Sequence, residues 1–274
     1  MERIAVIGMG IIGGSICGAL TQAGYKVDGF SRSEASLDYA VQAGYIDGKG
    51  VTLSHYDVVF IAVPPKATIE YLDGAPFKNG ALVADICGVK EVIERTVYSK
   101  PRNYRYVGLH PMAGKETSGI SSASPTLFKG ANLVITHAPC TSPDAVAQIK
   151  EYAKAMQFGK IVECSASEHD KKIALTSQLA HIVSNAYVKS KQVQDCDGFT
   201  GGSFQDMTRI AGVDETVWTP LYAYNRENII RELDGLISKL SVYKKALEEN
   251  NDEALSQALQ EGRLIREKIR KPND

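Results

Sequence analysis

An apolar segment that runs directly into a glycine-rich turn, close to the start of the chain, constrains the fold more than any other feature. Residues 4–7 are all apolar, and Gly8, Gly10 and Gly13 follow in the pattern G-x-G-x-x-G. The first glycine permits a tight turn from strand to helix, the second lets a pyrophosphate approach, and the third lets helix and strand pack closely. Free N–H groups at the start of that helix hold phosphate charge. We therefore predict a dinucleotide site formed by Gly8, Gly10, Ile11, Ile12 and Gly13; the alternative is a turn that only packs.

The first part of the chain alternates short apolar runs with helical patterns. Candidate strands lie at residues 4–7, 26–30, 58–63, 81–86, 106–109, 133–136 and 161–163. Their Val, Ile and Ala content is typical of a parallel sheet covered on both faces, and the helical patterns between them suit right-handed crossovers. After Glu168 long helical periods replace the strands. We predict an α/β fold: a Rossmann-type, doubly wound, mainly parallel sheet over residues 1–166, then an all-helical domain over residues 167–274.

Two long helical patterns near the C-terminus each carry one apolar stripe. Residues of these stripes recur every three or four positions, at Ile230, Leu233, Ile237, Leu240, Tyr243 and Leu247 in the first pattern, and at Leu255, Leu259, Gly262, Ile265 and Ile269 in the second. Each stripe needs a partner surface. The two helices can pair within the chain, or the helical domain can form a homodimer, and the pattern leaves both open.

Composition narrows the class of partner. The chain has 274 residues, 44% of them hydrophobic and 23% charged, with a net charge of −1. Such a balance gives no reason to expect nucleic acid or an anionic membrane as partner. No apolar run approaches the ~20 residues of a membrane span, and no signal peptide precedes the first strand. The five cysteines include no C-x-x-C pair, which argues against a zinc site or disulfides and fits a reducing compartment. We expect a cytoplasmic protein that binds a small molecule and no metal.

The residues after the second strand indicate which dinucleotide binds. In NAD sites an acidic residue about 20 positions beyond the glycines takes the ribose 2′-OH. Here Asp28 comes about three positions early, and Ser31, Arg32 and Ser33 occupy the end of the strand. A small hydroxyl beside a guanidinium suits a 2′-phosphate. We predict NADP, with NAD possible and with Val63 in the same site; the alternative for Arg32 is a solvated loop cation.

A histidine at the end of the fifth strand is the first candidate for chemistry. His110 follows residues 106–109 and precedes Pro111 and the small residues Ala113 and Gly114. Open α/β sheets bind ligands at the carboxyl ends of their strands. A His in the loop at that edge is well placed to act as a base over a bound cofactor.

A helix predicted at residues 173–188 carries an uncharged polar stripe. Ser177, Gln178, His181, Ser184 and Asn185 fall on one face, and residues 174–188 hold no formal charge if His181 is neutral. An ordinary solvated face would contain Lys or Glu. The stripe is typical of the wall of a polar pocket; the alternative is a buried contact between helices, bridged by hydrogen bonds.

A third candidate is Arg209, in a segment rich in glycine and apolar residues. It lies three residues after Asp206. The guanidinium can pair with Asp206, or it can bind a substrate carboxylate. The sequence leaves both possibilities open.

Taken together, these segments resemble the prephenate/arogenate dehydrogenase family of tyrosine biosynthesis. The resemblance spans nearly the whole chain and includes the glycine turn, residues 85–90, the H-P-M-A-G loop at residues 110–114, residues 177–181, and the F-x-D-x-T-R segment at residues 204–209. It implies a Rossmann domain followed by a helical domain that forms the dimer. It also implies the minimal form of these enzymes, without a mutase or regulatory extension.

The resemblance implies oxidative decarboxylation. A hydride leaves the ring carbon that bears the hydroxyl for the nicotinamide, the ring carboxylate departs as CO2, and the ring becomes aromatic. His110 would take the hydroxyl proton, Arg209 would bind a carboxylate, and His181 would contact the substrate side chain, with Gln178 and Gly114 nearby. Trp218 stands where the family often has a Trp near the pocket, although core packing would explain it equally.

Two departures from the family pattern bear on mechanism and specificity. Gly88 stands where the family often has a Ser that assists the catalytic His, so another donor or water must serve. Gln178 and Ala180 replace the first His and the Pro of the family's S-H-L-P-H segment. Because His181 is kept, and arogenate-preferring relatives often have an apolar residue there, we favour prephenate over arogenate.

Two other functions remain as alternatives. Another two-domain NAD(P) oxidoreductase, such as a β-hydroxyacid dehydrogenase, would typically use a Lys on the first helix of its second domain, but residues 174–188 contain none. A catalytically silent NADP-sensing protein would not need two histidines and an arginine near one pocket.

Overall fold

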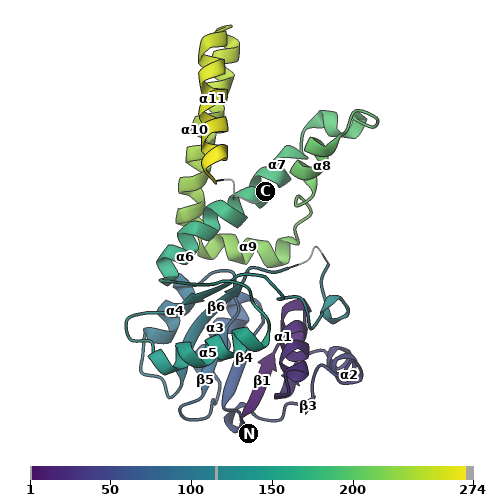
Figure 1. The fold of residues 1–274 in the computed structure, drawn as a ribbon, viewed down its shortest axis with the longest axis vertical. Helices are drawn as coiled ribbons and strands as arrows, with labels where there is room; N and C mark the ends of the chain where they lie inside the picture. Colours follow the sequence, from purple (N-terminus) through teal and green to yellow (C-terminus); the bar gives the residue numbers. More distant parts are fainter. Residues whose placement is uncertain (1, 115–116, 270–274) are drawn as a thin grey trace. The chain divides into compact units, whose positions relative to one another are not determined.

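The computed structural model describes residues 2–114 and 117–269 (Figure 1). Within that part of the chain, strands pair in the order β3-β2-β1-β4-β5-β6-β7-β8. Every neighbouring pair is parallel except β6 with β7, which is antiparallel. The predicted Rossmann-type, mainly parallel sheet is confirmed. The strands are β1 Arg3–Ile7, β2 Lys26–Phe30, β3 Gly48–Lys49, β4 Val58–Ile61, β5 Leu82–Asp85, β6 Arg105–Pro111, β7 Leu133–Thr136 and β8 Ile161–Cys164.

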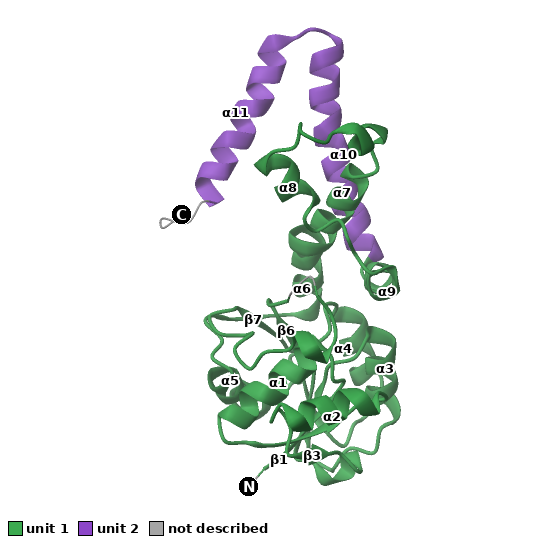
Figure 2. Cartoon of the chain, turned by 90° about the vertical axis from the view of Figure 1, so that its right-hand side faces the viewer, with its two compact units in different colours: residues 1–225 green, residues 226–274 purple. Residues whose placement is uncertain are grey.

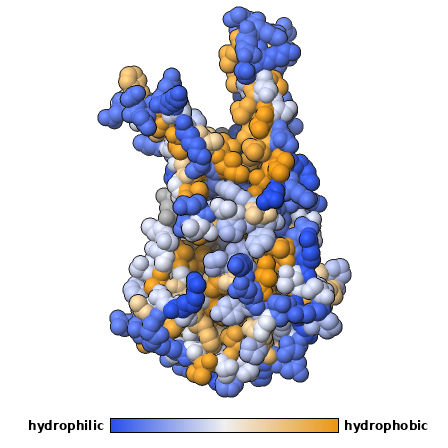
Figure 3. Space-filling model, turned by 180° about the vertical axis from the view of Figure 1, so that it is seen from behind, coloured by the Kyte–Doolittle hydropathy of each residue, from blue (hydrophilic) through white to orange (hydrophobic). Residues whose placement is uncertain are grey.

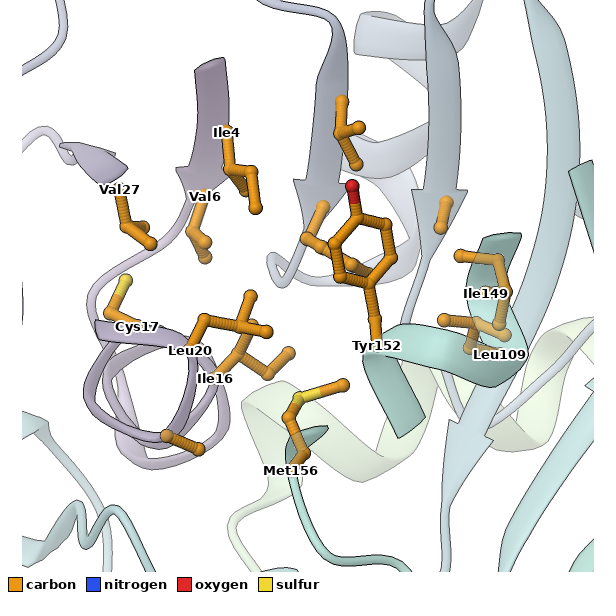
Figure 4. Packing of buried hydrophobic residues seen from close by; sticks show 14 of the residues in the cluster. Ile4, Val6, Ile16, Cys17, Leu20, Val27, Leu109, Ile149, Tyr152 and Met156 are labelled. Atoms are coloured by element: carbon orange, nitrogen blue, oxygen red, sulfur yellow. The ribbon is translucent and has the colours of Figure 1, made fainter. Parts of the chain in front are cut away.

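Helices cover both faces of the sheet. They are α1 Ile11–Gln22, α2 Glu34–Gln42, α3 Pro65–Gly74, α4 Glu91–Tyr98 and α5 Pro143–Ala155. Side chains alternate along each strand, so Ile4 and Val6 join one buried cluster while Ala5 and Ile7 join the other. The first cluster includes residues of α1 and α5, such as Leu20 and Ile149, seen in Figure 4. The second includes Leu72 of α3 and Ile93 of α4. Because both faces of the sheet are buried, its strands must be apolar at nearly every position.

Two details of the sheet differ from the prediction. The two-residue strand β3 carries no apolar run, so periodicity does not predict it. β6 extends to Pro111, because His110 pairs with Val134 of β7. His110 therefore lies in the last part of a strand and not in the loop after it, which corrects the prediction and fixes its backbone more firmly.

The elements described after β8 are all helical. α6 Ala166–Ile173, the π-helical segment η3 Ala174–Leu179 and α7 Ala180–Tyr187 form one continuous run, followed by η4 Lys191–Asp195, α8 Gly202–Thr208 and α9 Glu215–Tyr224. π-helical turns inside helices frequently occur at functional sites. Here the turn includes Gln178, a member of the polar stripe.

The structure divides into two compact units, residues 1–225 and 226–274 (Figure 2). The second unit is a helical hairpin of α10 Arg226–Glu248 and α11 Asp252–Ile269. Its turn uses Asn250 in the left-handed region, at φ +52°, and the Tyr243 hydroxyl donates to the Ala258 carbonyl across the hairpin. α6 to α9 belong to the first unit by this division, so the domain limit at residue 166 stays a prediction. Among the described helices, none has the length and apolar character needed to cross a bilayer.

Candidate active site

A cavity of about 1010 Å³ is lined by residues that follow β1, β2 and β4. Gly8 makes the turn out of β1 at φ +101°, and a Cβ there would lie 2.3 Å from the Ala62 carbonyl oxygen. A Cβ on Gly13 would lie 1.8 Å from the Gly8 carbonyl oxygen. Only glycine fits either position, so the tight turn and the close packing of α1 both depend on them.

Gly10 differs from the other two glycines because it faces open space. A Cβ on it would meet no described atom within 4 Å. Gly10 is also the N-cap of α1, and no described side chain caps that helix. The phosphate groups of a dinucleotide can bind uncapped N–H groups at the start of a helix only where such open space lets them approach. The residues present therefore fit a dinucleotide at this turn.

Ser31, Arg32, Ser33 and Val63 all line the same cavity. Asp28 is not among the lining residues. Its carboxylate accepts a hydrogen bond from the Tyr56 hydroxyl at 2.8 Å and pairs with Arg3 at 3.3 Å. The structure adds two charged residues of α3 that the sequence reading did not select, Lys66 and Glu70. The cavity lining thus includes two cations, Arg32 after β2 and Lys66 on α3, and one carboxylate, Glu70.

His110 begins a chain of hydrogen bonds that ends on backbone amides. Its Nδ1 lies 2.8 Å from Nε2 of His169, and Nδ1 of His169 lies 2.7 Å from Oδ1 of Asp170. The Asp170 carboxylate also accepts the backbone N–H groups of Lys90 at 2.8 Å and Glu91 at 2.9 Å. His169 and Asp170 are buried on α6. The sequence reading missed both, since they lie 59 and 60 positions after His110 and carry no local signal.

The Asp170 carboxylate determines which atom donates in each of these hydrogen bonds. An ionised carboxylate only accepts hydrogen bonds, so Nδ1 of His169 must carry the proton that Asp170 receives. Nε2 of a neutral His169 is then bare and accepts from Nδ1–H of His110. It follows that Nε2 of a neutral His110 has a free lone pair.

The surroundings keep both imidazoles neutral. Burial lowers the pKa of His110 well below its usual value, and His169 and Lys90 lower it further. Burial also lowers the pKa of His169, although its hydrogen bond to Asp170 opposes the shift. A neutral His110 with a bare nitrogen can accept a proton.

A buried ion pair fixes the loop that supports Asp170. The Lys90 ammonium bonds the Asp85 carboxylate, and both side chains are fully buried. Asp85 also accepts the Tyr106 hydroxyl at 2.6 Å and the Cys87 N–H at 2.9 Å. Burial, and then the Asp85 charge, raise the pKa of Tyr106 well above its usual value, so Tyr106 stays a donor. These contacts hold the backbone that presents two amides to Asp170.

Helix α9 links His110 to the second predicted histidine. Leu221 lies 3.7 Å from a Cβ built on Gly88, which in turn lies 3.8 Å from Nε2 of His110. One turn earlier, Trp218 packs on His181 with ring centroids 4.1 Å apart. Residues three apart on a helix share a face and rise by about 4.5 Å. His110 and His181 thus lie along one face of one helix.

The predicted substrate-binding residue Arg209 is the sequence neighbour of a residue that contacts His181. Nδ1 of His181 donates to the Ile210 carbonyl at 2.9 Å. Arg209 precedes that carbonyl, is exposed, and caps the C-terminal end of α8. The structure therefore brings together His181, Trp218 and the backbone next to Arg209.

Comparison with known proteins assigns the family. Residues 16–162 match the family model described as "Prephenate dehydrogenase, nucleotide-binding domain", and residues 165–261 match "Prephenate dehydrogenase, dimerization domain". The chain belongs to the prephenate dehydrogenase family. It is an NAD(P)-dependent dehydrogenase with a nucleotide-binding domain, which sets aside a silent sensor or another class of two-domain oxidoreductase.

Individual relatives are distant but match along their length. The chain is 28% identical to prephenate dehydrogenase of Bacillus subtilis over 93% of this chain and 72% of that protein. It is 27% identical to cyclohexadienyl dehydrogenase of Zymomonas mobilis over 100% of this chain and 98% of that protein. The crystal structure of Aquifex aeolicus prephenate dehydrogenase with hydroxyphenyl propionate and NAD+ is 26% identical, with a TM-score of 0.86, over 98% of this chain and 99% of that one. The fold is shared with Synechocystis arogenate dehydrogenase, at a TM-score of 0.80 and 24% identity over 98% of this chain and 100% of that one.

The polar stripe on η3 and α7 serves mainly to hold neighbouring helices. Ser184 donates to the Met207 carbonyl at 2.7 Å and Asn185 to the Ala211 carbonyl at 3.0 Å. Gln178, 2% exposed, accepts from Asn225 at 2.6 Å. These contacts match the alternative of a hydrogen-bonded helix contact. Substrate binding by Gln178 stays a prediction.

Gly114 is exposed and is the last residue of the H-P-M-A-G loop. Residues 115 and 116, which follow it, lie outside the described residues. Further along the chain, the Ser124 N–H donates to the Ser15 hydroxyl of α1 at 2.9 Å. The segment after His110 therefore returns to the helix that starts at the glycine turn. A role of Gly114 in substrate binding stays a prediction.

Proposed function

We propose that this chain catalyses the oxidative decarboxylation of prephenate to 4-hydroxyphenylpyruvate in tyrosine biosynthesis, with NADP as its preferred oxidant. The observation that carries the proposal is the chain of hydrogen bonds from Asp170 through His169 to His110, which leaves Nε2 of His110 bare. That nitrogen lies at the carboxyl edge of a dinucleotide-binding sheet, where such folds bind their ligands.

The residues of the site suit each stage of the reaction. When bound, the nicotinamide supplies the hydride acceptor. Nε2 of His110 takes the hydroxyl proton as the ring carbonyl forms. The ring carboxylate then leaves as CO2, its bonding electrons enter the ring, and the resulting phenolate oxygen can take the proton back from His110. Aromatisation drives this last stage, so the main tasks of the protein are positioning and proton transfer.

Two residues beyond His110 suit the recognition of substrate. Arg209 offers a guanidinium for one of the two carboxylates of prephenate. His181 lies against Trp218 and would contact the keto side chain. The proposal requires both to face the same substrate as His110, and α9 supports this because it contacts the surroundings of both histidines.

One contact favours arogenate as a second candidate substrate. Because Nδ1 of His181 donates to the Ile210 carbonyl, a neutral His181 presents a bare Nε2, which accepts a hydrogen bond but cannot donate one. The ammonium of arogenate is a donor and suits that nitrogen directly. The keto group of prephenate only accepts hydrogen bonds, so that nitrogen offers it no direct hydrogen bond.

The preference for NADP rests on the end of β2. Ser31 stands where a carboxylate would repel a 2′-phosphate, and Arg32 and Lys66 line the cavity on two elements. Asp28 is occupied by Tyr56 and Arg3. The free-energy cost for an exposed Arg to bind a phosphate through two parallel hydrogen bonds is small.

The experiment that tests this proposal is a steady-state assay at the reduced-nicotinamide absorbance band. It crosses prephenate and arogenate with NADP and NAD. We expect the highest kcat/KM with prephenate and NADP. A higher value with arogenate would make arogenate the substrate, and equal values with both cofactors would contradict the NADP preference.

A further inference from the structure

Among the residues that the structure describes, the catalytic candidate His110 has a hydrogen-bond partner on one side of its ring only. On its Nδ1 side it bonds His169 at 2.8 Å. On its Nε2 side stands Gly88, whose missing Cβ would lie 3.8 Å from that nitrogen.

His169 is held firmly enough to orient another ring. Its imidazole is 2% exposed, and Asp170 fixes its Nδ1. Asp170 is itself held by the amides of Lys90 and Glu91 through its carboxylate, and by Asn225 through its backbone carbonyl. These anchors come from the loop after β5 and from the end of α9. An imidazole fixed in this way presents one bare nitrogen in one direction.

The opposite arrangement of protons is unfavourable. If His169 donated from Nε2 to His110, its Nδ1 would be bare and would face the Asp170 carboxylate at 2.7 Å. Two acceptors at hydrogen-bond distance, both buried, leave one polar group unsatisfied, which is unfavourable. The tautomer of His169 is therefore set by Asp170, and that of His110 by His169.

The charged groups that act on the two rings are Asp170 on α6, Lys90 in the loop after β5, and Asp85 at the end of β5. All three side chains are buried. Lys90 lowers the pKa of both histidines, whereas the two carboxylates oppose the shift only at His169. The ring next to the carboxylates is therefore His169, and His110 is the ring that burial and the Lys90 charge keep neutral.

We propose that His169 is the positioning residue that keeps His110 in the tautomer with a bare Nε2. The role of His110 as base rests on the proposed function. The tautomer of His110 does not, because it exists in the free protein.

A two-bond hydrogen–nitrogen NMR spectrum of the imidazole rings reads the tautomer directly, without substrate. The chain has five histidines, so each ring can be assigned by substitution. We expect His110 in the Nδ1–H form at neutral pH in the wild-type protein. In His169→Phe, which keeps a ring but has no acceptor, we expect a mixture or the Nε2–H form.

Kinetics with the same variants separate positioning from folding. For His169→Phe we expect kcat to fall about 10²-fold, the scale of a misplaced general base, with KM for substrate nearly unchanged. His169→Gln keeps an oxygen that can accept from His110, so it should recover much of the loss. Thermal melting of each variant shows whether it is folded.

Position 88 supplies a matched pair of variants. A Cβ on Gly88 makes only ordinary contacts, at 3.7 Å and beyond, so Gly88→Ala and Gly88→Ser should both fold. In the His169→Phe background, Ser should donate to Nε2 of His110 and restore the Nδ1–H form and part of kcat, whereas Ala should restore neither.

Two results would overturn the proposal: an unchanged His110 tautomer in folded His169→Phe, or an unchanged kcat in that variant. Failure of the wild-type protein to oxidise prephenate or arogenate would instead refute the proposed function. The NMR result would still decide the tautomer in that case.

Discussion

At the scale of single residues, the neutrality of His110 is the property on which proton transfer depends. Burial, His169 and Lys90 all lower its pKa. A base must be unprotonated, so kcat/KM should be lost as pH falls through this lowered pKa and retained above it. We therefore expect the acidic limb of the pH profile of kcat/KM to lie below about 6.5, the value of an ordinary His.

The measurement is a pH profile of kcat/KM at saturating cofactor, with thermal melting at each pH to exclude unfolding. An acidic limb at or above the ordinary value for His would contradict a base that its surroundings keep neutral.

A second prediction at this scale concerns Arg209. Arg209→Gln removes the guanidinium but keeps a polar chain of similar size. If Arg209 binds a substrate carboxylate, KM should rise by about 10-fold or more, the loss of a charge-assisted pair, with little change in melting temperature. A steady KM together with a collapsed melting temperature would show that Arg209 is structural.

At the scale of elements, the sequence predicted the strands and the glycine turn but not the contacts between residues far apart in the chain. The apolar runs predicted β1, β2, β4, β5, β7 and β8 within a few residues, because strands buried on both faces must be apolar throughout. His169 was missed since its importance comes from a contact with a residue 59 positions away. Lys66 was missed for the same reason, because α3 reaches the cavity only in the folded sheet.

The polar stripe shows why the sequence predicted only part of the candidate site. Its lack of charge indicated burial correctly. The sequence could not decide between a pocket wall and a contact between helices, because both bury uncharged donors and acceptors. Ser184 and Asn185 bond backbone carbonyls, while His181 also packs on an aromatic ring. The outcome depends on where α8 and α9 pack.

The loop after β2 carries the prediction on cofactor choice. Arg32→Ala should raise KM for NADP by about 10-fold or more and leave KM for NAD nearly unchanged, because only NADP has a 2′-phosphate for the guanidinium to bind. Lys154→Ala, an exposed cation of α5 outside the cavity lining, is the control. Equal losses with both cofactors would remove the basis for the NADP preference.

At the scale of the whole molecule, the helical hairpin leaves apolar side chains uncovered. Ile237, Leu240 and Leu247 on α10, and Leu259, Ile265 and Ile269 on α11, are all at least half exposed. Figure 3 shows hydrophobic side chains gathered along these helices. The two helices contact each other within the hairpin, yet part of each stripe stays exposed. We propose that a second copy of the chain covers it in a homodimer.

Substitutions on that surface test the homodimer. Leu240→Glu places a charge in the proposed interface and should give a monomer in sedimentation-velocity experiments, since stable interfaces depend on a desolvated apolar centre. Lys245→Glu adds the same side chain at an exposed position on the opposite face of α10 and should leave the dimer intact. A wild-type protein that sediments as a monomer at micromolar concentration would contradict the proposal.

The most direct test of the whole account is the stoichiometry of one reaction catalysed by the wild-type protein and by His110→Asn. Prephenate consumed, reduced NADP formed and CO2 released are measured in the same vessel. The account predicts equal amounts of all three for the wild-type protein. For His110→Asn it predicts the same ratio at a rate about 10²-fold lower, with NADP affinity retained. An undiminished rate in His110→Asn, or reduced NADP formed without CO2, would contradict it.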